Sequence, residues 1–223
     1  MQIVRAGKSN KRLYIIAVFG VFLVIAILYI CLAFQVVVPR GNDCTIGIID
    51  GSLSKEYKNV ISNQQTGSPE LTHGDSMIIF AKNYCPSIEI YYYNAENAKG
   101  LVDTDSILKG LAWMLENNVG AVNISMSSTK FSEKLQAWIT KNAEDIHVYA
   151  SYNNLEESWD YPAMYDNVVG AGVKNRVKHK DNAVLFSSNN ILLLGSHWGK
   201  YSGNSYLSLL CIITDNVASE HSK

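Results

Sequence analysis

Little net charge is present in this sequence: its 223 residues include 19 Lys and Arg and 20 Asp and Glu, a formal net charge of −1. Such a balance gives no electrostatic basis for nucleic-acid binding. Gly47 and Gly51 lack the third glycine of a dinucleotide-binding loop. Four of the five histidines show no metal-ligand spacing: His147, His179, His197 and His221. We therefore predict no cofactor, no metal and no nucleic-acid partner.

One long hydrophobic run stands near the N-terminus. From Leu13 to Val38, Gln35 is the only clearly polar residue near the middle or end of the run. About 20 apolar residues suffice for a helix to cross a bilayer. A cleaved signal peptide is the alternative, but its apolar core is usually about 7–15 residues long and ends at a small-x-small site, which this stretch lacks. We therefore predict a retained transmembrane anchor over residues 13–38.

Basic residues flank this run unevenly. Only Arg40 follows it closely, whereas four basic residues precede it: Arg5, Lys8, Lys11 and Arg12. Basic flanks stay on the cytoplasmic side of a membrane. The asymmetry predicts a single-pass protein of the cell membrane, with residues 1–12 in the cytoplasm. Residues 39–43 would form a short linker, and the chain beyond them would lie outside the cytoplasm.

Beyond the linker, patterns typical of strands and helices alternate. Apolar, β-branched and aromatic runs predict strands at 44–50, 87–95, 120–127, 147–152 and 167–173, with two shorter ones in AVLFSS and ILLLG. Helical spacing and caps predict helices from His73, from Asp103 or Thr104, around 131–139, and from Ser205 to about Asp215. The alternation favours an α/β fold with a mostly parallel sheet and helices on both faces.

The predicted domain covers residues 44–215 and is followed by a polar tail at 216–223. Within it, the polar segment Lys55–Pro69 is predicted to be a loop. Asn123-Ile124-Ser125 matches the N-glycosylation pattern, but it falls in a predicted central strand, so we interpret it as structural.

Four polar residues stand at predicted strand ends or helix starts. Asp50 ends the strand in IGIIDGS, His73 opens the helix in THGDSMIIFA, Asn153 follows the strand in VYASYNN, and Ser205 enters the helix in KYSGNSYLSLL. Taken alone, each of these four residues is equally typical of an ordinary strand end, helix cap or turn. Their order Asp, His, Ser is one of the chain orders of the serine-nucleophile triad.

These segments resemble the motifs of the subtilase family of serine proteases. IGIIDGS is similar to the family's aspartate motif, HGDSMIIFA to its histidine motif, VYASYNN to its oxyanion asparagine motif and SGNSYLSLL to its serine motif. VNISMSS is similar to the substrate-binding strand, and YPAMYDNVVGAGV to the Tyr-Pro-Ala stretch and the strand after it. The resemblance spans nearly all of residues 43–215 and implies a subtilisin-like three-layer fold.

The resemblance also implies a role for each residue. Ser205 would be the nucleophile, His73 its general base, and Asp50 the carboxylate that orients the imidazole. The side chain of Asn153 and the backbone N–H of Ser205 would stabilise the oxyanion. A peptide or protein substrate would bind as an added strand along Ser125, Met126 and Ser127. The implied activity is that of a membrane-anchored serine endopeptidase outside the cytoplasm, which could trim exported peptides.

Several positions depart from the family's pattern. Asp75 and Ser76 replace the threonine and histidine after His73-Gly74, and Tyr152 stands where glycine normally precedes the asparagine. Other substitutions surround the proposed nucleophile: Asn204, Tyr206, Leu207 and Leu209. A catalytically silent, peptide-binding domain on the same fold is therefore the alternative. Because all four catalytic roles are filled, we favour an active enzyme.

Cysteine is scarce, with one residue in the apolar run and three beyond it. Three is an odd number, so at most one disulfide can form within the outer domain. Cys44 would start the first strand, and Cys85 would follow the helix opened by His73, which puts both at the same edge of the sheet. The pattern predicts a possible Cys44–Cys85 disulfide; the alternative is that both are buried thiols. Cys211 is predicted to be a buried thiol.

Overall fold

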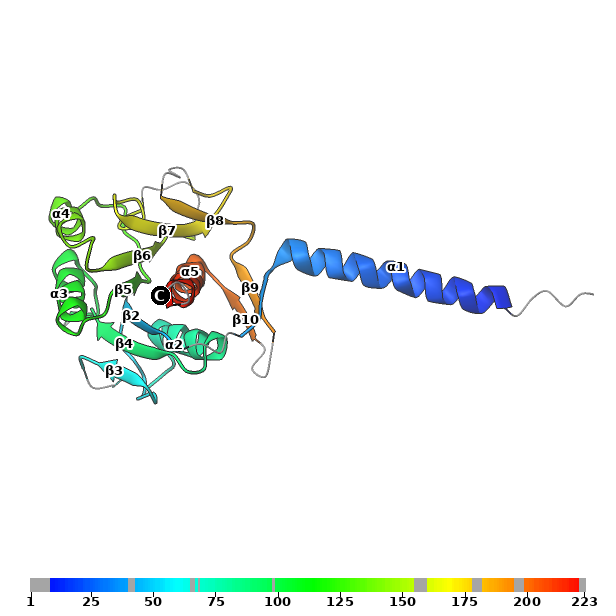
Figure 1. Ribbon diagram of the computed structural model, residues 1–223, viewed down its shortest axis with the longest axis horizontal. Coiled ribbons are helices and arrows are strands. Elements are labelled where there is room, and N and C mark those ends of the chain that lie inside the picture. Colours follow the sequence, from blue (N-terminus) through cyan, green and yellow to red (C-terminus); the bar gives the residue numbers. More distant parts are fainter. Residues whose placement is uncertain are drawn as a thin grey trace, which may run out of the picture.

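The computed structural model describes residues 9–39, 43–64, 67, 69–97, 99–154, 160–177, 182–194 and 199–220. A seven-stranded sheet of order β3-β4-β2-β5-β6-β7-β8 forms the centre of the domain, and its paired strands are parallel (Figure 1). Its strands are β2 Thr45–Asp50, β3 Val60–Ser62, β4 Glu89–Asn94, β5 Ala121–Ile124, β6 His147–Ser151, β7 Val168–Val173 and β8 Ala183–Phe186. The predicted parallel α/β fold is confirmed.

Helices cover both faces of this sheet. Helices α2 (His73–Tyr84) and α5 (Asn204–Glu220) pack on one face, and α3 (Thr104–Glu116) and α4 (Glu133–Lys141) on the other (Figure 1). The central strand β2 is therefore buried on both sides, with Ile46 and Ile48 toward α2 and α5 and Ile49 toward α3. This two-sided burial explains why its sequence is an unbroken apolar run instead of an alternating one.

The order of the strands reverses at β2. The chain moves from β2 to β3 and β4 on one side, and then crosses to β5 on the other. Open parallel sheets place ligand sites at the carboxyl ends of the strands beside such a reversal. Asp50 ends β2 and Ser125 follows β5, so two of the predicted site residues flank this point.

The N-terminal helix begins four residues before the predicted anchor and ends five residues before it does. Helix α1 covers Ser9–Ala33, and its segment Tyr14–Ala33 has a mean hydropathy of 3.1 and no residue buried in the domain. It is long and apolar enough to cross a membrane, although a signal sequence meets the same criterion. The basic residues Arg5, Lys8 and Arg40 and the histidines His179, His197 and His221 lie outside the described residues.

A second, three-stranded sheet corrects the predicted boundaries. Strand β1 (Gln35–Val37) falls within the predicted anchor at 13–38, and it pairs in parallel with β9 (Asn190–Leu193). Strand β10 (Gly199–Ser202) pairs with β9 in the antiparallel sense. These strands are held by partners distant in the sequence, so local patterns did not predict β1 or β10. Two further boundaries differ: β3 lies in the predicted loop, and α5 runs to Glu220, into the predicted tail.

Cys44 and Cys85 meet at the edge of the sheet opposite the carboxyl strand ends. Both are buried, and their sulfur atoms lie 3.8 Å apart. A hydrogen bond with Cys44, aided by bonds from Ser87, lowers the pKa of the Cys85 thiol to about 7 although burial opposes the shift. A thiol with such a pKa is ionised in part near neutral pH, and the thiolate is the form that reacts in disulfide formation.

We therefore predict that Cys44 and Cys85 form a disulfide when the domain folds under oxidising conditions. The bridge would close a loop with a sequence separation of 41, which corresponds to about 4 kcal/mol of stabilisation on the chain-entropy scale. Non-reducing peptide mapping should recover the two cysteines in one linked species, and Cys85→Ser should lower the thermal midpoint while Cys211→Ser leaves the linked species intact. Recovery of free thiols at both positions would contradict the prediction.

Candidate active site

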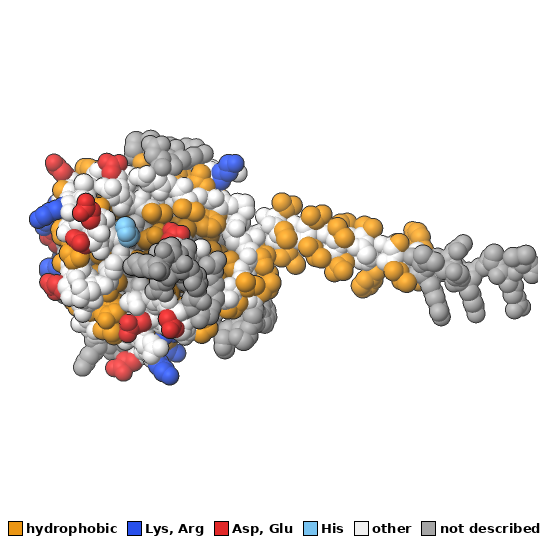
Figure 2. Space-filling model, in the orientation of Figure 1, with side chains coloured by type: hydrophobic (Ala, Val, Ile, Leu, Met, Phe, Trp, Pro, Cys, Tyr) orange, Lys and Arg blue, Asp and Glu red, His pale blue; other side chains and the backbone are white. Residues whose placement is uncertain are grey.

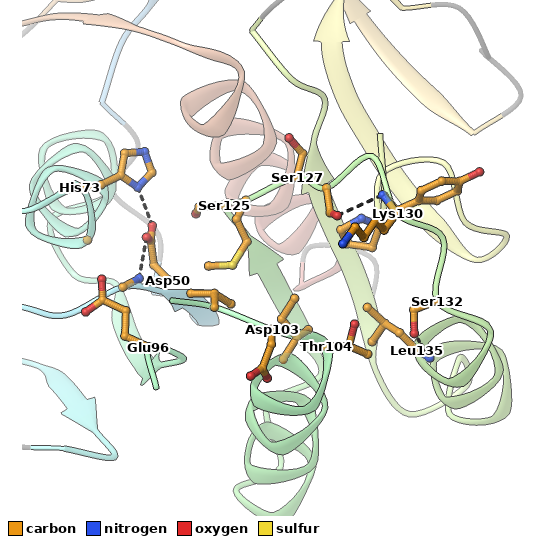
Figure 3. A pocket seen from close by; sticks show the side chains of 18 of the residues that line it. Asp50, His73, Glu96, Asp103, Thr104, Ser125, Ser127, Lys130, Ser132 and Leu135 are labelled. Carbon is orange, nitrogen blue, oxygen red and sulfur yellow. Dashed lines mark hydrogen bonds and ion pairs between the residues drawn. The ribbon is translucent and has the colours of Figure 1, made fainter. Parts of the chain in front are cut away.

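Asp50 and His73 form a hydrogen-bonded pair at the carboxyl edge of the sheet. Nδ1 of His73 lies 2.8 Å from Oδ2 of Asp50 (Figure 3). The Asp50 side chain is 7% exposed, whereas that of His73 is 48% exposed. The second carboxylate oxygen of Asp50 accepts a bond from the Gly51 amide. A buried carboxylate thus holds an imidazole whose other edge faces the open side of the site.

The start of α2 is fixed by a capping box. The Thr72 hydroxyl accepts a bond from the Asp75 amide, and the Asp75 carboxylate accepts one from the Thr72 amide at 2.7 Å. This carboxylate also accepts bonds from the Ser54 amide and the Tyr57 hydroxyl. Burial acts to raise the pKa of Asp75, but these hydrogen bonds outweigh it and lower the pKa. Asp75, one of the departures from the family, thus ties the loop after β2 to the helix that begins with His73.

Close contact between α2 and the sheet depends on Gly74. A Cβ atom at this position would lie 1.9 Å from the hydroxyl oxygen of Tyr92 on β4. That hydroxyl donates a hydrogen bond to the Gly51 carbonyl at 2.7 Å. The contact brings the first turn of α2 against the end of β2, which is the approach that the Asp50–His73 bond requires.

Ser205 lies in the first turn of α5, directly after β10. Gly203 connects the two elements with a φ of 135°, a conformation that favours glycine. The Ser205 side chain donates a 3.2 Å hydrogen bond to the carbonyl of Ser125, and no hydrogen bond joins these two described side chains, Ser205 and His73. The neighbouring Tyr206 ring contacts His73, with 6.4 Å between ring centroids. In this conformation the three predicted triad residues therefore share one region, but only Asp50 and His73 are directly bonded.

Two adjacent asparagines follow β6, and they are held differently. The Asn153 amide donates to the Asp160 carboxylate, and its carbonyl accepts from the Asn204 side chain. The Oδ1 atom of Asn154 accepts a 2.8 Å bond from the Asn204 amide at the start of α5. The Asn154 side chain thus reaches the first turn of α5, beside Ser205. The repeated asparagine was visible in the sequence, but residue type alone could not distinguish the two positions.

A cleft of about 940 Å³ extends from the Asp50–His73 pair. Figure 3 shows His73 and Asp50 on one wall and Lys130 and Leu135 on the other. The predicted substrate-binding residues line it: Ser125, Met126 and Ser127. Neither Asn153 nor Ser205 is among its lining residues.

The chemistry of the cleft changes along its length. Acidic side chains, those of Glu96 and Asp103, line it near the pair, and Lys130 is the basic residue on the far wall. Apolar side chains also line it: Val102, Ile107, Phe131, Leu135, Tyr161 and Tyr165. Among the described residues, no group of three His, Cys, Asp or Glu side chains is arranged to hold a metal ion. The cleft is suited to an extended chain with mixed polar and apolar side chains.

Comparison with known proteins identifies the family. Residues 57–207 match the sequence model of the Subtilase family, a stretch that includes His73 and Ser205 and begins after Asp50. The chain belongs to the subtilase family. This subtilase is 28% identical to Subtilisin DY of Bacillus licheniformis over 198 residues, which cover 76% of the chain and 71% of the relative. It is 32% identical to the minor extracellular protease Epr of Bacillus subtilis over 167 residues, 66% of the chain but 25% of the relative.

Solved structures agree on the fold of this subtilase. The prenylagaramide maturation protease PagA matches with a TM-score of 0.62 at 12% identity, covering 77% of this chain and 73% of that one. A lanthipeptide protease matches with a TM-score of 0.55 at 13% identity, and the match covers 80% of this chain and 75% of that one. The family and its protease relatives support a serine-protease hydrolase that acts on peptides or proteins.

We predict that hydrolysis by this subtilase falls on the acid side of neutrality. The hydrogen bond with Asp50 raises the pKa of His73, against the opposing effect of burial. A general base must be neutral, so kcat/KM should decline as pH falls through this raised pKa, with a midpoint above the ordinary value of about 6.5. Asp50→Asn should move the midpoint to lower pH. A profile that stays flat from acid to neutral pH would argue against a histidine base.

Proposed function

We propose that this subtilase is an endopeptidase that uses Asp50, His73 and Ser205 as its catalytic triad. The observation that carries the proposal is the 2.8 Å bond between Asp50 and His73 at the mouth of a substrate-sized cleft. His73 accepts the proton of the Ser205 hydroxyl as the oxygen attacks the peptide carbonyl, and then returns it to the leaving amine. Asp50 stabilises the imidazolium that forms between these steps.

For these catalytic steps to occur, the Ser205 hydroxyl must turn away from the Ser125 carbonyl and toward His73. The present bond to Ser125 is 3.2 Å long, at the weak end for a hydroxyl donor. Hydrogen bonds between a nucleophile and its base are often long or misaligned without substrate and tighten when it binds. A peptide that pairs with the backbone at Ser125–Ser127 adds a strand beside that carbonyl.

We assign the oxyanion side-chain donor to Asn154 in place of Asn153. The Oδ1 atom of Asn154 is occupied by the Asn204 amide, and no described residue accepts a bond from its Nδ2. That amide group is therefore available as a donor beside Ser205. The backbone N–H of Ser205 is the second donor, because amides in the first turn of a helix lack an intrahelical partner. The positive end of the α5 dipole adds to their effect.

A catalytically silent, peptide-binding domain is the second candidate. The bond from Ser205 to the Ser125 carbonyl favours it, because a nucleophile held there is not activated by His73. A serine-directed phosphonate distinguishes the two candidates, since it modifies only an activated serine.

We predict that Ser205→Ala and His73→Ala each reduce peptide hydrolysis by several orders of magnitude while the fold is retained. Matched controls are Ser62→Ala on the edge strand β3 and His147→Ala at the start of β6, both of which should hydrolyse peptides normally. The wild-type chain should react with the phosphonate at Ser205. Absence of this labelling in a folded protein that still binds peptides would establish the silent alternative, and normal turnover in Ser205→Ala would exclude Ser205 as nucleophile.

The two asparagines can be separated by paired substitutions. Asn154→Ala should lower kcat by about a hundredfold or more with little change in KM, as expected for the loss of one oxyanion donor. Asn154→Asp keeps the oxygen that accepts from Asn204 but removes the amide donor, so it should be equally impaired. The substitutions Asn153→Ala and Asn153→Asp should lower kcat less than the same changes at position 154. A larger loss at position 153 would restore the assignment made from the sequence.

We further propose that α1 anchors the enzyme, with the N-terminus in the cytoplasm and the catalytic domain outside. The apolar segment Tyr14–Ala33 and the basic residues before it support this topology. An anchored protease of this orientation suits the trimming of exported peptides or of proteins close to the membrane.

This topology predicts that a protease added to intact cells digests the domain after Val38. The full-length chain should remain with the membrane after alkaline extraction. Protection of the domain until the membrane is broken would reverse the orientation. Release of a soluble domain that has lost the apolar segment would establish a cleaved signal peptide.

A further inference from the structure

One part of the outer face of the three-stranded sheet is unusually apolar. Its inner face carries Ile191 and Leu193, which are fully buried. Strand register places Val36, Leu192 and Lys200 side by side on the opposite, outer face. Val38 and Leu194 continue this face and are 62% and 42% exposed. We call these five residues the outer apolar face.

This composition is opposite to that expected of a sheet face in water. Solvent-facing strands normally alternate apolar residues inside with polar residues outside. Among these five residues Lys200 is the polar one, and its amine lies 5.1 Å from the centre of the Phe34 ring. Asn190 and Ser202 extend the same side of the sheet at the end away from Val38 and Leu194, and their side chains bond to each other at 2.9 Å. Contiguous exposed apolar side chains of this kind mark an interaction surface.

The position of α1 identifies what covers the face. Twenty helical residues from Tyr14 to Ala33 span about 30 Å, the thickness of the hydrocarbon core of a bilayer. Ala33 then lies at the boundary of that core, and β1 begins two residues later. A strand advances about 3.3 Å per residue, so Val36 and Val38 lie at most about 10 and 17 Å along the chain from Ala33. The headgroup region extends about 5–8 Å beyond the core. Figure 1 shows the strand after α1 running across the axis of that helix, which keeps both valines close to this region.

Hydrogen bonds hold the end of α1 against this sheet. The Ser188 hydroxyl donates to the Ala33 carbonyl at 2.9 Å, and the Gln35 side chain donates to the Ser187 hydroxyl at 2.6 Å. Figure 1 shows β9 and β10 on the side of the domain from which α1 leaves. Figure 2 shows hydrophobic side chains along α1 and at the adjoining edge of the domain.

We propose that the outer apolar face rests in the headgroup region of an anionic bilayer, with Lys200 against lipid phosphates. This rests on the proposed membrane anchoring. Contact with lipid fixes the position of β10. Because β10 ends at Ser202, Ser205 follows it by three residues and is held at a fixed distance from the bilayer. The docked domain therefore holds its nucleophile close to the membrane surface, so the substrates within reach are membrane-proximal segments or peptides leaving the bilayer.

The test uses the full-length chain in vesicles of phosphatidylcholine and phosphatidylserine, with an NBD fluorophore on one cysteine. In a Cys31→Ser background, Val36→Cys and Leu194→Cys report on the face, and Leu101→Cys is the control, an apolar residue that is 61% exposed on another loop. The NBD emission of the labels at positions 36 and 194 should shift to shorter wavelength on addition of vesicles. It should be quenched by doxyl lipids and resist quenching by iodide in the water. The label at 101 should remain accessible to iodide.

A label on Cys31 in the native background separates this proposal from the anchoring itself. Suppose that doxyl lipids quench the label on Cys31, while iodide quenches labels at positions 36 and 194 as strongly as the label at position 101. This result would support the membrane anchor and overturn the docking proposal. If iodide also quenches the label on Cys31, both the anchoring and the docking proposals are overturned. Labels that resist iodide without lipid quenching would show that a second copy covers the face, which also overturns the proposal.

The role of Lys200 has its own comparison. Lys200→Glu should reduce the blue shift at position 36 in vesicles that contain phosphatidylserine, and the reduction should be smaller in phosphatidylcholine alone. Lys109→Glu on α3 makes the same change of charge away from the face and should leave the shift unaltered. An equal effect of both substitutions would remove Lys200 from the proposal.

Discussion

The buried carboxylate of Asp75 holds together the two segments that carry the proposed catalytic pair. It accepts hydrogen bonds from Ser54, Tyr57 and Thr72, and so joins the loop after β2 to the first turn of α2. Hydrogen bonds to a charged group contribute about 1.5–3 kcal/mol each. This tie acts together with the backbone pairing of β2, which ends at Asp50, and with the bond from the Tyr92 hydroxyl to the Gly51 carbonyl. A departure from the family's pattern therefore has a structural role of its own here.

Asn204 plays a comparable part on the other side of the site. Its buried amide donates to the carbonyls of Tyr152 and Asn153, and its backbone amide is bonded by Asn154. These bonds join the end of β6 to the start of α5. An oxyanion site requires donors that are already oriented when charge develops, because reorientation would consume the electrostatic advantage. In the oxyanion site that we propose, Asn204 contributes to this rigidity through three hydrogen bonds.

The sequence predicted the parts of the fold that depend on local patterns. The apolar run at 44–50 predicted strand β2, and helical spacing and caps predicted that α2 begins at His73. It did not predict β1 and β10, because strands of three and four residues form only through pairing with β9. It named Asn153 as the oxyanion residue, and our proposal of Asn154 rests on a contact with α5 that the sequence does not show.

The join between helix and domain has a practical consequence. Because Gln35–Val37 pairs with β9, the catalytic domain begins at the end of α1 and not after the apolar run. A soluble version cut at Val38 would lose β1 and expose one edge of β9, and exposed strand edges promote aggregation. A version that starts at Phe34 keeps this strand but carries the outer apolar face into water. Recombinant production of the domain should therefore retain β1 and replace the exposed Val36 and Val38 by polar residues.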